Sequence, residues 1–116
     1  MGFQLHTREI DRVIVVEAVG KLTLTDGHTQ LRDLIHVSTG NGARKFILNL
    51  ARTEHIDSYG IGELLRSYSV VRQCGGEMKL SCVNPKVLEI LKISRMNWVF
   101  EIHPDDEAAL RAFVGA

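Results

Sequence analysis

The sequence predicts an α/β fold built on a mixed, largely parallel sheet of about five strands with about four helices. One observation behind this prediction is that short apolar runs alternate with segments whose apolar residues recur at helical spacing. A second is that the first residues show the pattern of an antiparallel hairpin. A third is size, because 116 residues, 45% hydrophobic and 24% charged, suit one globular core. Residues 1–116 are therefore predicted to form a single domain.

The N-terminal hairpin is indicated by two strand patterns that a polar turn separates. Apolar and polar residues alternate over positions 3–7, and Glu9–Arg12 supplies the turn. The Val13–Val16 run that follows is apolar on both faces, which is typical of a strand inside a sheet. We therefore expect the first strand nearer an edge and the second strand inside, with Gly20 ending the second.

A first helix is expected after this hairpin. Either Thr25 or Asp26 can cap its start, and Gly40-Asn41-Gly42 stops it. Three apolar residues at helical spacing are expected to face inward: Leu31, Leu34 and Ile35.

The middle of the chain reads as a strand, a helix and a second strand. Lys45–Leu50 is a short apolar run that suits a buried strand, and a helix is predicted from about Ser58 to Gln73. Gly75-Gly76 ends that helix, and apolar alternation over residues 78–82 predicts the next strand. This order predicts a parallel crossover.

The remaining residues predict two more helices around a final strand. Asn84 can cap a helix whose first position suits Pro85, because a missing amide hydrogen costs nothing there. Trp98–Ile102 is predicted to be the last strand. The acidic residues of positions 104–107 complement the dipole at the start of a terminal helix.

The segment from His55 to Gly62 is the most informative for function. It places the Ser58 hydroxyl at a strand-to-helix turn, beside the Asp57 carboxylate and close to Gly60. Free amides and the positive end of a helix dipole can receive an oxyanion there, so the segment reads as a phosphorylation switch. Serine and aspartate are also preferred helix caps, worth about 1 kcal/mol, which is a purely structural explanation of the same residues.

This turn is expected to share one edge of the sheet with other connections. Ligands and partners of largely parallel α/β sheets gather at the carboxyl ends of the strands. The turns at 20–26, 51–60 and 83–85 are predicted to lie at that edge.

An ordered string of motifs resembles a known family. It consists of Phe46–Leu50, then Ile56-Asp57-Ser58-x-Gly60-x-Gly62, then Gly75–Leu80, then Asn84-Pro85. Together these motifs resemble the STAS domain of anti-sigma-factor antagonists, over roughly residues 10–113. The resemblance implies a cytoplasmic binding protein that is phosphorylated at Ser58 by a cognate anti-sigma-factor serine kinase. Only the unphosphorylated form would bind the kinase and free its sigma factor, and a phosphatase would reverse the modification.

The resemblance also indicates which residues face the partner. They are expected to be Thr23, Asp57, Ser58, Tyr59, Gly60, Gly62 and Arg66. The two glycines can let a partner backbone approach, or can merely relieve crowding near the sheet. Arg66 can contact an acidic partner surface or simply be solvated.

Three residues depart from the family pattern. Tyr59 replaces a small residue after the phosphorylated serine, and Thr23 stands where such antagonists often carry aspartate. Arg95 replaces a glycine usual at a helix end, where a left-handed backbone would be strained.

Composition argues against several other functions. Lys plus Arg and Asp plus Glu both number 14, so there is no basic surplus for nucleic acid. No signal-peptide pattern or membrane-spanning run is found, which makes direct membrane insertion unexpected and the cytosol the expected location. The histidines are scattered, the two cysteines form no CxxC, and no P-loop or kinase signature is present. We therefore expect no metal, no cofactor and no enzymatic activity.

Two rival functions remain at this point. Small STAS domains also serve as subunits of lipid-transport or other transporter complexes, or as scaffolds that are not phosphorylated. Retention of Asp57-Ser58 argues against that alternative. The second rival is a small enzyme that uses His55, Asp57 and Ser58, and three neighbours on one turn rarely converge as nucleophile, base and orienting group.

Overall fold

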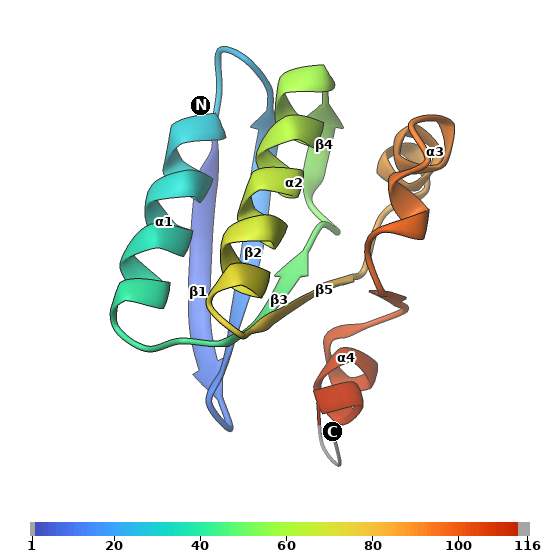
Figure 1. Cartoon of the computed structure of the whole chain (residues 1–116). Helices are drawn as coiled ribbons and strands as arrows, with labels where there is room; N and C mark the ends of the chain where they lie inside the picture. The colour runs from blue at the N-terminus through green and yellow to red at the C-terminus, as the bar shows by residue number, and fades with distance from the viewer. Residues whose placement is uncertain (1, 114–116) are drawn as a thin grey trace.

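A six-stranded sheet forms the centre of the computed structural model, which describes residues 2–113 (Figure 1). The sheet order is β1-β2-β3-β5-β6, and β4 pairs with β2 beyond the end of β3. All pairs of strands are parallel except β1 with β2, as predicted for a mixed, largely parallel sheet. The strands are β1 (Gln4–Ile10), β2 (Val13–Leu22), β3 (Lys45–Asn49), β4 (Thr53–Ile56), β5 (Glu77–Ser81) and β6 (Ile102–His103).

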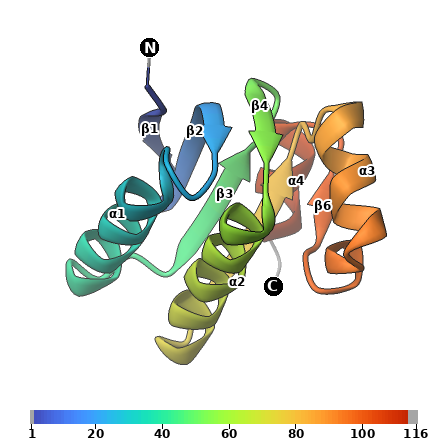
Figure 2. The same ribbon diagram turned by 90° about the horizontal axis from the view of Figure 1, so that it is seen from above.

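Helices cover both faces of this sheet. In the described part of the chain they are α1 (His28–Gly40), α2 (Ser58–Gln73), α3 (Pro85–Ile93) and α4 (Asp106–Phe113), with a short 3-10 turn η1 (Met96–Trp98). Figure 2 separates the layers, with α1 and α2 on one side of the strands and α4 on the other. The larger core lies under α1, α2 and α3, and a smaller one packs Ala109 and Phe113 of α4 against Val13, Val15 and Ile47.

The N-terminal hairpin is confirmed. Strands β1 and β2 run antiparallel, from Gln4 opposite Val19 to Ile10 opposite Val13. Strand β1 lies at the edge of the sheet, and β2 lies inside it with β3 on its other side. The apolar run on both faces of β2 therefore predicted its interior position correctly.

The prediction that Gly20 ends the second strand is wrong. Strand β2 continues to Leu22, and its register shifts between Gly20 and Lys21, where Gly20 has φ +109°. Glycine permits this left-handed bend at no steric cost, so the strand changes direction instead of stopping. The last residues of β2 then pair with β4, a four-residue strand that the sequence reading took for part of a turn.

The predicted cap of the first helix is also wrong. Gly27, with φ +82°, occupies the N-cap position of α1 and makes no side-chain capping bond. A Cβ atom at Gly27 would lie 2.5 Å from the Phe3 ring, so packing against that ring requires glycine there. Asp26 instead closes a turn with Thr23.

The segment after α3 differs most from its prediction. Helix α3 has Asn84 as its cap, with Pro85 at its first position, as predicted. The expected strand Trp98–Ile102 is wrong, because η1 ends at Trp98 and β6 has only two residues. Trp98 is 86% exposed. Arg95 has φ +62°, the strained left-handed conformation anticipated for a residue at a glycine position.

Candidate functional site

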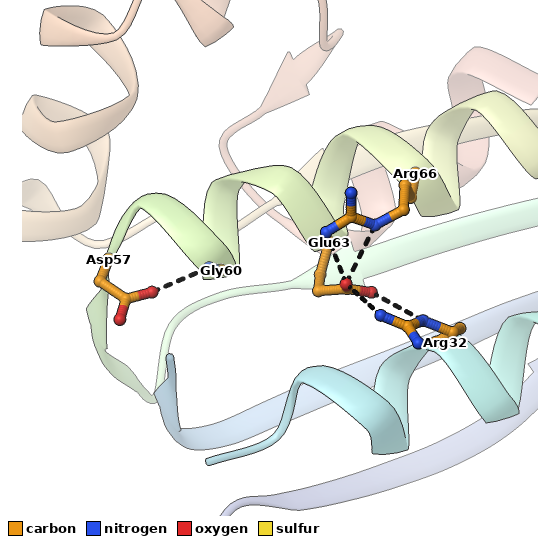
Figure 3. Close-up of polar contacts among 5 residues, drawn as sticks. All are labelled: Arg32, Asp57, Gly60, Glu63 and Arg66. Atoms are coloured by element: carbon orange, nitrogen blue, oxygen red, sulfur yellow. Dashed lines mark hydrogen bonds and ion pairs between the residues drawn. The ribbon is translucent and has the colours of Figure 1, made fainter. Parts of the chain in front are cut away.

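The start of α2 is fixed by Asp57. Strand β4 ends at Ile56, Asp57 adopts an extended backbone conformation as N-cap, and one of its carboxylate oxygens accepts a hydrogen bond from the Gly60 amide at 2.9 Å (Figure 3). Asp57 is therefore the cap, and Ser58 is the first helical residue. The predicted strand-to-helix turn is confirmed, although the strand before it is β4 rather than Lys45–Leu50.

The same carboxylate joins a second turn to this helix. Its other oxygen accepts a hydrogen bond from the Leu24 amide at 3.1 Å, in the connection between β2 and α1. Thr23 closes that connection, because its amide donates to the Asp26 carbonyl at 2.8 Å and its hydroxyl accepts from the Asp26 amide at 3.2 Å. Two of the three turns predicted to share an edge thus meet at Asp57.

The third turn reaches the same edge through Asn84. Its side-chain amide donates to the carbonyl oxygens of Leu50 at 3.0 Å and Thr53 at 2.8 Å, which brackets the connection between β3 and β4. The predicted gathering of turns at the carboxyl ends of the strands is therefore confirmed.

Backbone amides keep the Asp57 carboxyl ionised. Partial burial raises its pKa, but hydrogen bonds from the amides of Gly60 and Leu24, with a smaller contribution from nearby His55, outweigh burial and lower the pKa. A negative charge also interacts favourably with the positive end of the α2 dipole. Asp57 is thus a charged group whose two oxygens are both engaged inside the protein.

Gly60 lets the first turn of α2 approach β2. It is buried, and a Cβ atom there would lie 2.0 Å from the carbonyl oxygen of Leu22. This contact supports the crowding explanation for Gly60. Gly62 is different, because a Cβ atom there would first meet the flexible Arg66 side chain at 3.2 Å.

The groups around the cap remain open to solvent. Ser58 is exposed, and no hydrogen bond within residues 2–113 holds its hydroxyl. Tyr59 is 52% exposed and Leu24, on the turn that Asp57 holds, is 48% exposed. The edge therefore presents the Ser58 hydroxyl at a helix N-terminus, with the large side chains of Tyr59 and Leu24 exposed on the two turns that meet at Asp57.

A buried carboxylate lies further along α2, and sequence reasoning missed it. The Glu63 side chain is only 2% exposed, and Arg66 and Arg32 of α1 both bind it (Figure 3). Arg32 Nη2 lies 2.6 Å and Arg66 Nη2 lies 2.7 Å from Glu63 Oε1. The i, i+3 spacing of Glu63 and Arg66 could have indicated half of this cluster, whereas Arg32 lies 31 residues away in sequence.

Two opposing effects set the pKa of Glu63. Burial raises it, but the hydrogen bonds and positive charges of Arg32 and Arg66 outweigh burial and lower it. The cluster holds α1 to α2, since Arg32 belongs to one helix and Glu63 to the other. Arg66 is thus exposed but engaged inside the protein, rather than simply solvated.

The predicted site residues are only partly brought together. Asp57, Ser58, Tyr59 and Gly60 form the first turn of α2, while Arg66 lies two turns away and belongs to the Glu63 cluster. Thr23 is buried, at 9% exposure, and its hydroxyl serves its own turn. Their contacts with a partner stay predictions.

The geometry does not support the rival function of a small enzyme that uses His55, Asp57 and Ser58. Within the described residues, no hydrogen bond joins His55 or Ser58 to the Asp57 carboxylate, whose oxygens bind amides instead. The same residues contain no cluster of three or more His, Cys, Asp or Glu side chains suited to a metal ion. None of the helices within residues 2–113 has the length and apolar character needed to cross a bilayer.

Comparison with known proteins agrees with this geometry. The family description STAS domain matches residues 4–109. The anti-sigma F factor antagonist of Paenibacillus polymyxa is 28% identical over 115 residues, which cover 95% of this chain and 94% of that protein. The putative anti-sigma factor antagonist BtrV of Bordetella bronchiseptica is 32% identical over 110 residues, with 95% and 94% covered.

Solved structures share the fold. The anti-sigma factor antagonist SpoIIAA in its unphosphorylated form superposes with a TM-score of 0.73 at 21% identity, covering 99% of this chain and 100% of that one. The phosphorylated form of SpoIIAA, from Bacillus, gives a TM-score of 0.70 at 23% identity, covering 96% and 99%.

Proposed function

The chain belongs to the STAS domain family, and we propose that it is an anti-sigma-factor antagonist switched by phosphorylation of Ser58. The unphosphorylated form binds a cognate anti-sigma-factor serine kinase and releases the sigma factor that the kinase holds. Phosphorylation ends that binding, and a phosphatase restores it. The whole chain acts as one cytoplasmic STAS domain and contributes no catalytic group, since ATP and magnesium belong to the kinase.

The observation that carries this proposal is the free, exposed Ser58 hydroxyl at the first position of α2. Asp57 supplies the helix cap, so capping does not explain the serine at position 58. The two curated relatives bear the names of anti-sigma factor antagonists, which favours this function over a transporter subunit or an unphosphorylated scaffold.

The physical basis of the switch is charge. A phosphoryl group adds about 1.5 to 2 negative charges where a neutral hydroxyl stood. The α2 N-terminus tolerates that charge in solvent, but a partner surface that covers Ser58 would have to desolvate it beside the ionised Asp57. If phosphorylation weakened binding by about 4 kcal/mol, affinity would fall roughly a thousandfold.

Phosphorylation itself is the direct test. The purified chain is incubated with ATP, magnesium and each candidate anti-sigma kinase of its host, and intact mass is measured with peptide mapping. We expect one phosphate, on Ser58. The Ser58→Ala variant is the matched control: it should take no phosphate yet still bind the kinase. If no candidate kinase modifies the wild-type chain, the proposal is wrong and a transporter subunit or scaffold becomes the better explanation.

A charge mimic separates signalling from folding. Ser58→Asp should stay folded, because the residue is exposed and lies at the positive end of α2, yet bind the kinase weakly. A Ser58→Asp protein that unfolds would instead support a structural role for the serine.

A further inference from the structure

We propose that Leu24 and Tyr59 form an apolar contact pair beside Ser58, and that this pair determines affinity and selectivity for the kinase. This inference rests on the proposed function and deepens it, because it names the groups that the partner must recognise. The sequence predicts partner contacts mainly at Asp57 and its neighbours, Tyr59 among them. The structure adds Leu24, so that each of the two turns that meet at Asp57 contributes one exposed hydrophobic residue.

Exposure is the first observation. Large hydrophobic side chains of this chain are mostly buried, and within residues 2–113 six remain exposed: Leu24, Val37, Tyr59, Ile93, Trp98 and Val99. Two of the six lie next to the switch residue, with Tyr59 at 52% and Leu24 at 48% exposure. Exposed aromatic and aliphatic groups that gather at a polar site are typical of a protein interface.

Rigid placement is the second observation. The amide of Leu24 donates to Asp57 at 3.1 Å, and the turn of Thr23 and Asp26 closes on itself through three hydrogen bonds. Tyr59 belongs to the first turn of α2. That turn packs closely against the Leu22 carbonyl, because Gly60 has no side chain to keep them apart. Both side chains are thus presented from fixed backbone, so binding them costs little conformational entropy.

The neighbouring polar groups are less available to a partner. One carboxylate oxygen of Asp57 accepts a hydrogen bond from the Gly60 amide, and the other accepts one from the Leu24 amide. Thr23 is buried, and its hydroxyl accepts a hydrogen bond within its own turn. The exposed surface of the two turns that meet at Asp57 therefore includes two large hydrophobic side chains, Leu24 and Tyr59. It fits a kinase surface with an apolar pocket, where a hydrogen-bond acceptor or donor can meet the tyrosine hydroxyl.

This arrangement also explains why a phosphate would be effective at this position. A partner that covers the whole first turn of α2 covers Ser58 together with Tyr59 and excludes water from both. A phosphoryl group there would lose hydration against an apolar surface, which is the least favourable place for a charge. Apolar anchors beside the modified residue thus convert one phosphate into a large loss of affinity.

Binding of the cognate kinase tests this inference. Dissociation constants are measured by calorimetry in the Ser58→Ala background, so that no phosphorylation occurs. We expect Leu24→Ala and Tyr59→Ala each to weaken binding by about tenfold to a hundredfold. Tyr59→Phe, which keeps the ring, should bind within a few-fold of the parent.

Exposed hydrophobic residues elsewhere provide matched controls. Trp98→Ala removes a side chain that is 86% exposed, and Val37→Ala removes one that is 63% exposed. Neither should change the dissociation constant, and circular dichroism with thermal unfolding should show that all the variants fold. Unchanged affinity in Leu24→Ala and Tyr59→Ala overturns this inference alone. Failure of the parent chain to bind any host kinase overturns both this inference and the proposed function.

Discussion

Helix α2 holds two ionised carboxylates in two different ways. Asp57, at its start, accepts hydrogen bonds from the backbone amides of Gly60 and Leu24, whereas Glu63 accepts them from the long side chains of Arg32 and Arg66. Backbone donors are supplied by the fold itself and are not removed when a side chain is truncated. Side-chain donors can be removed one at a time, so the two regions should respond differently to mutation.

The two regions of α2 therefore have different tasks: the first turn exposes side chains to solvent, and the Glu63 cluster holds α2 to α1. In the first turn, backbone amides bind the Asp57 carboxylate, while the side chains of Ser58 and Tyr59 are exposed to solvent. The Glu63 cluster, one turn further on, holds α2 to α1 and exposes only the outer parts of two arginines. Four changes test this division, from the largest expected effect to the smallest.

The close packing of the first turn should be the most sensitive feature. Gly60→Ala places a methyl group 2.0 Å from the Leu22 carbonyl oxygen, so the helix must move away from β2. We expect the free energy of unfolding in urea to fall by about 3 kcal/mol. Gly62→Ala is the control, since its nearest neighbour is a flexible arginine, and should stay within about 1 kcal/mol of wild type. Equal effects at both glycines would show that the contact with β2 is unimportant.

Removal of both arginines should have the next largest effect. Arg32→Ala with Arg66→Ala leaves the buried Glu63 carboxylate without its partners. We expect a loss of about 2–3 kcal/mol in urea unfolding at neutral pH, less than for a fully enclosed pair because water reaches the truncated site. Adding Glu63→Leu to that double variant should restore part of the loss. A double variant as stable as wild type would mean that the cluster does not hold the helices together.

Loss of the cap should cost less. Asp57→Ala removes the acceptor for the Gly60 and Leu24 amides, and those amides can turn to water instead. We expect a loss of about 1–2 kcal/mol in the same unfolding experiment. Hydrogen exchange should quicken at Leu24 as well as in the first turn of α2. Faster exchange in α2 alone would show that the two turns are held independently of Asp57.

Acid should remove the charge contribution of both carboxylates, which is the smallest of the four expected effects. The pKa of each is lower in the folded chain than in the unfolded one, so each contributes stability above the unfolded pKa. That contribution is lost as pH falls from about 4 through the lowered folded pKa. The dependence of unfolding free energy on pH should be shallower in acid for Glu63→Gln and for Asp57→Asn. An unchanged acid slope in both variants would contradict the assigned pKa shifts.

Much of this architecture follows from local sequence signals. The hairpin, the helix starts at Asn84 and at Asp57-Ser58, and the crossover through α2 depend on neighbouring residues, so they could be predicted. Exposure of Ser58 beside an ionised aspartate was also predictable, because turn residues and helix dipoles act over a few positions.

The features that were missed depend on distant partners. Strand β4 forms because β2 continues past the bend at Gly20 and pairs with it. The four residues of β4 have mixed polarity, so their own sequence does not indicate a strand. Gly27 replaces the expected cap because the Phe3 ring lies against it. Glu63 looks like a surface residue until Arg32 of another helix is placed beside it. The Leu24 contact with Asp57 likewise joins residues 33 positions apart.

Strand β2 is the strand to which three others are hydrogen-bonded. It pairs with β1 along one edge and with β3 and then β4 along the other, because it continues past Gly20. No neighbouring strand can leave without breaking a ladder to β2, so its interior amide hydrogens should exchange with deuterium only when the whole domain opens. The two-residue β6, bound to β5 alone, should exchange far earlier through local opening. The turn at Leu24 directly follows β2, and Ser58 follows β4, which pairs with the end of β2, so we expect the switch to lie next to the slowest-exchanging strand of the chain.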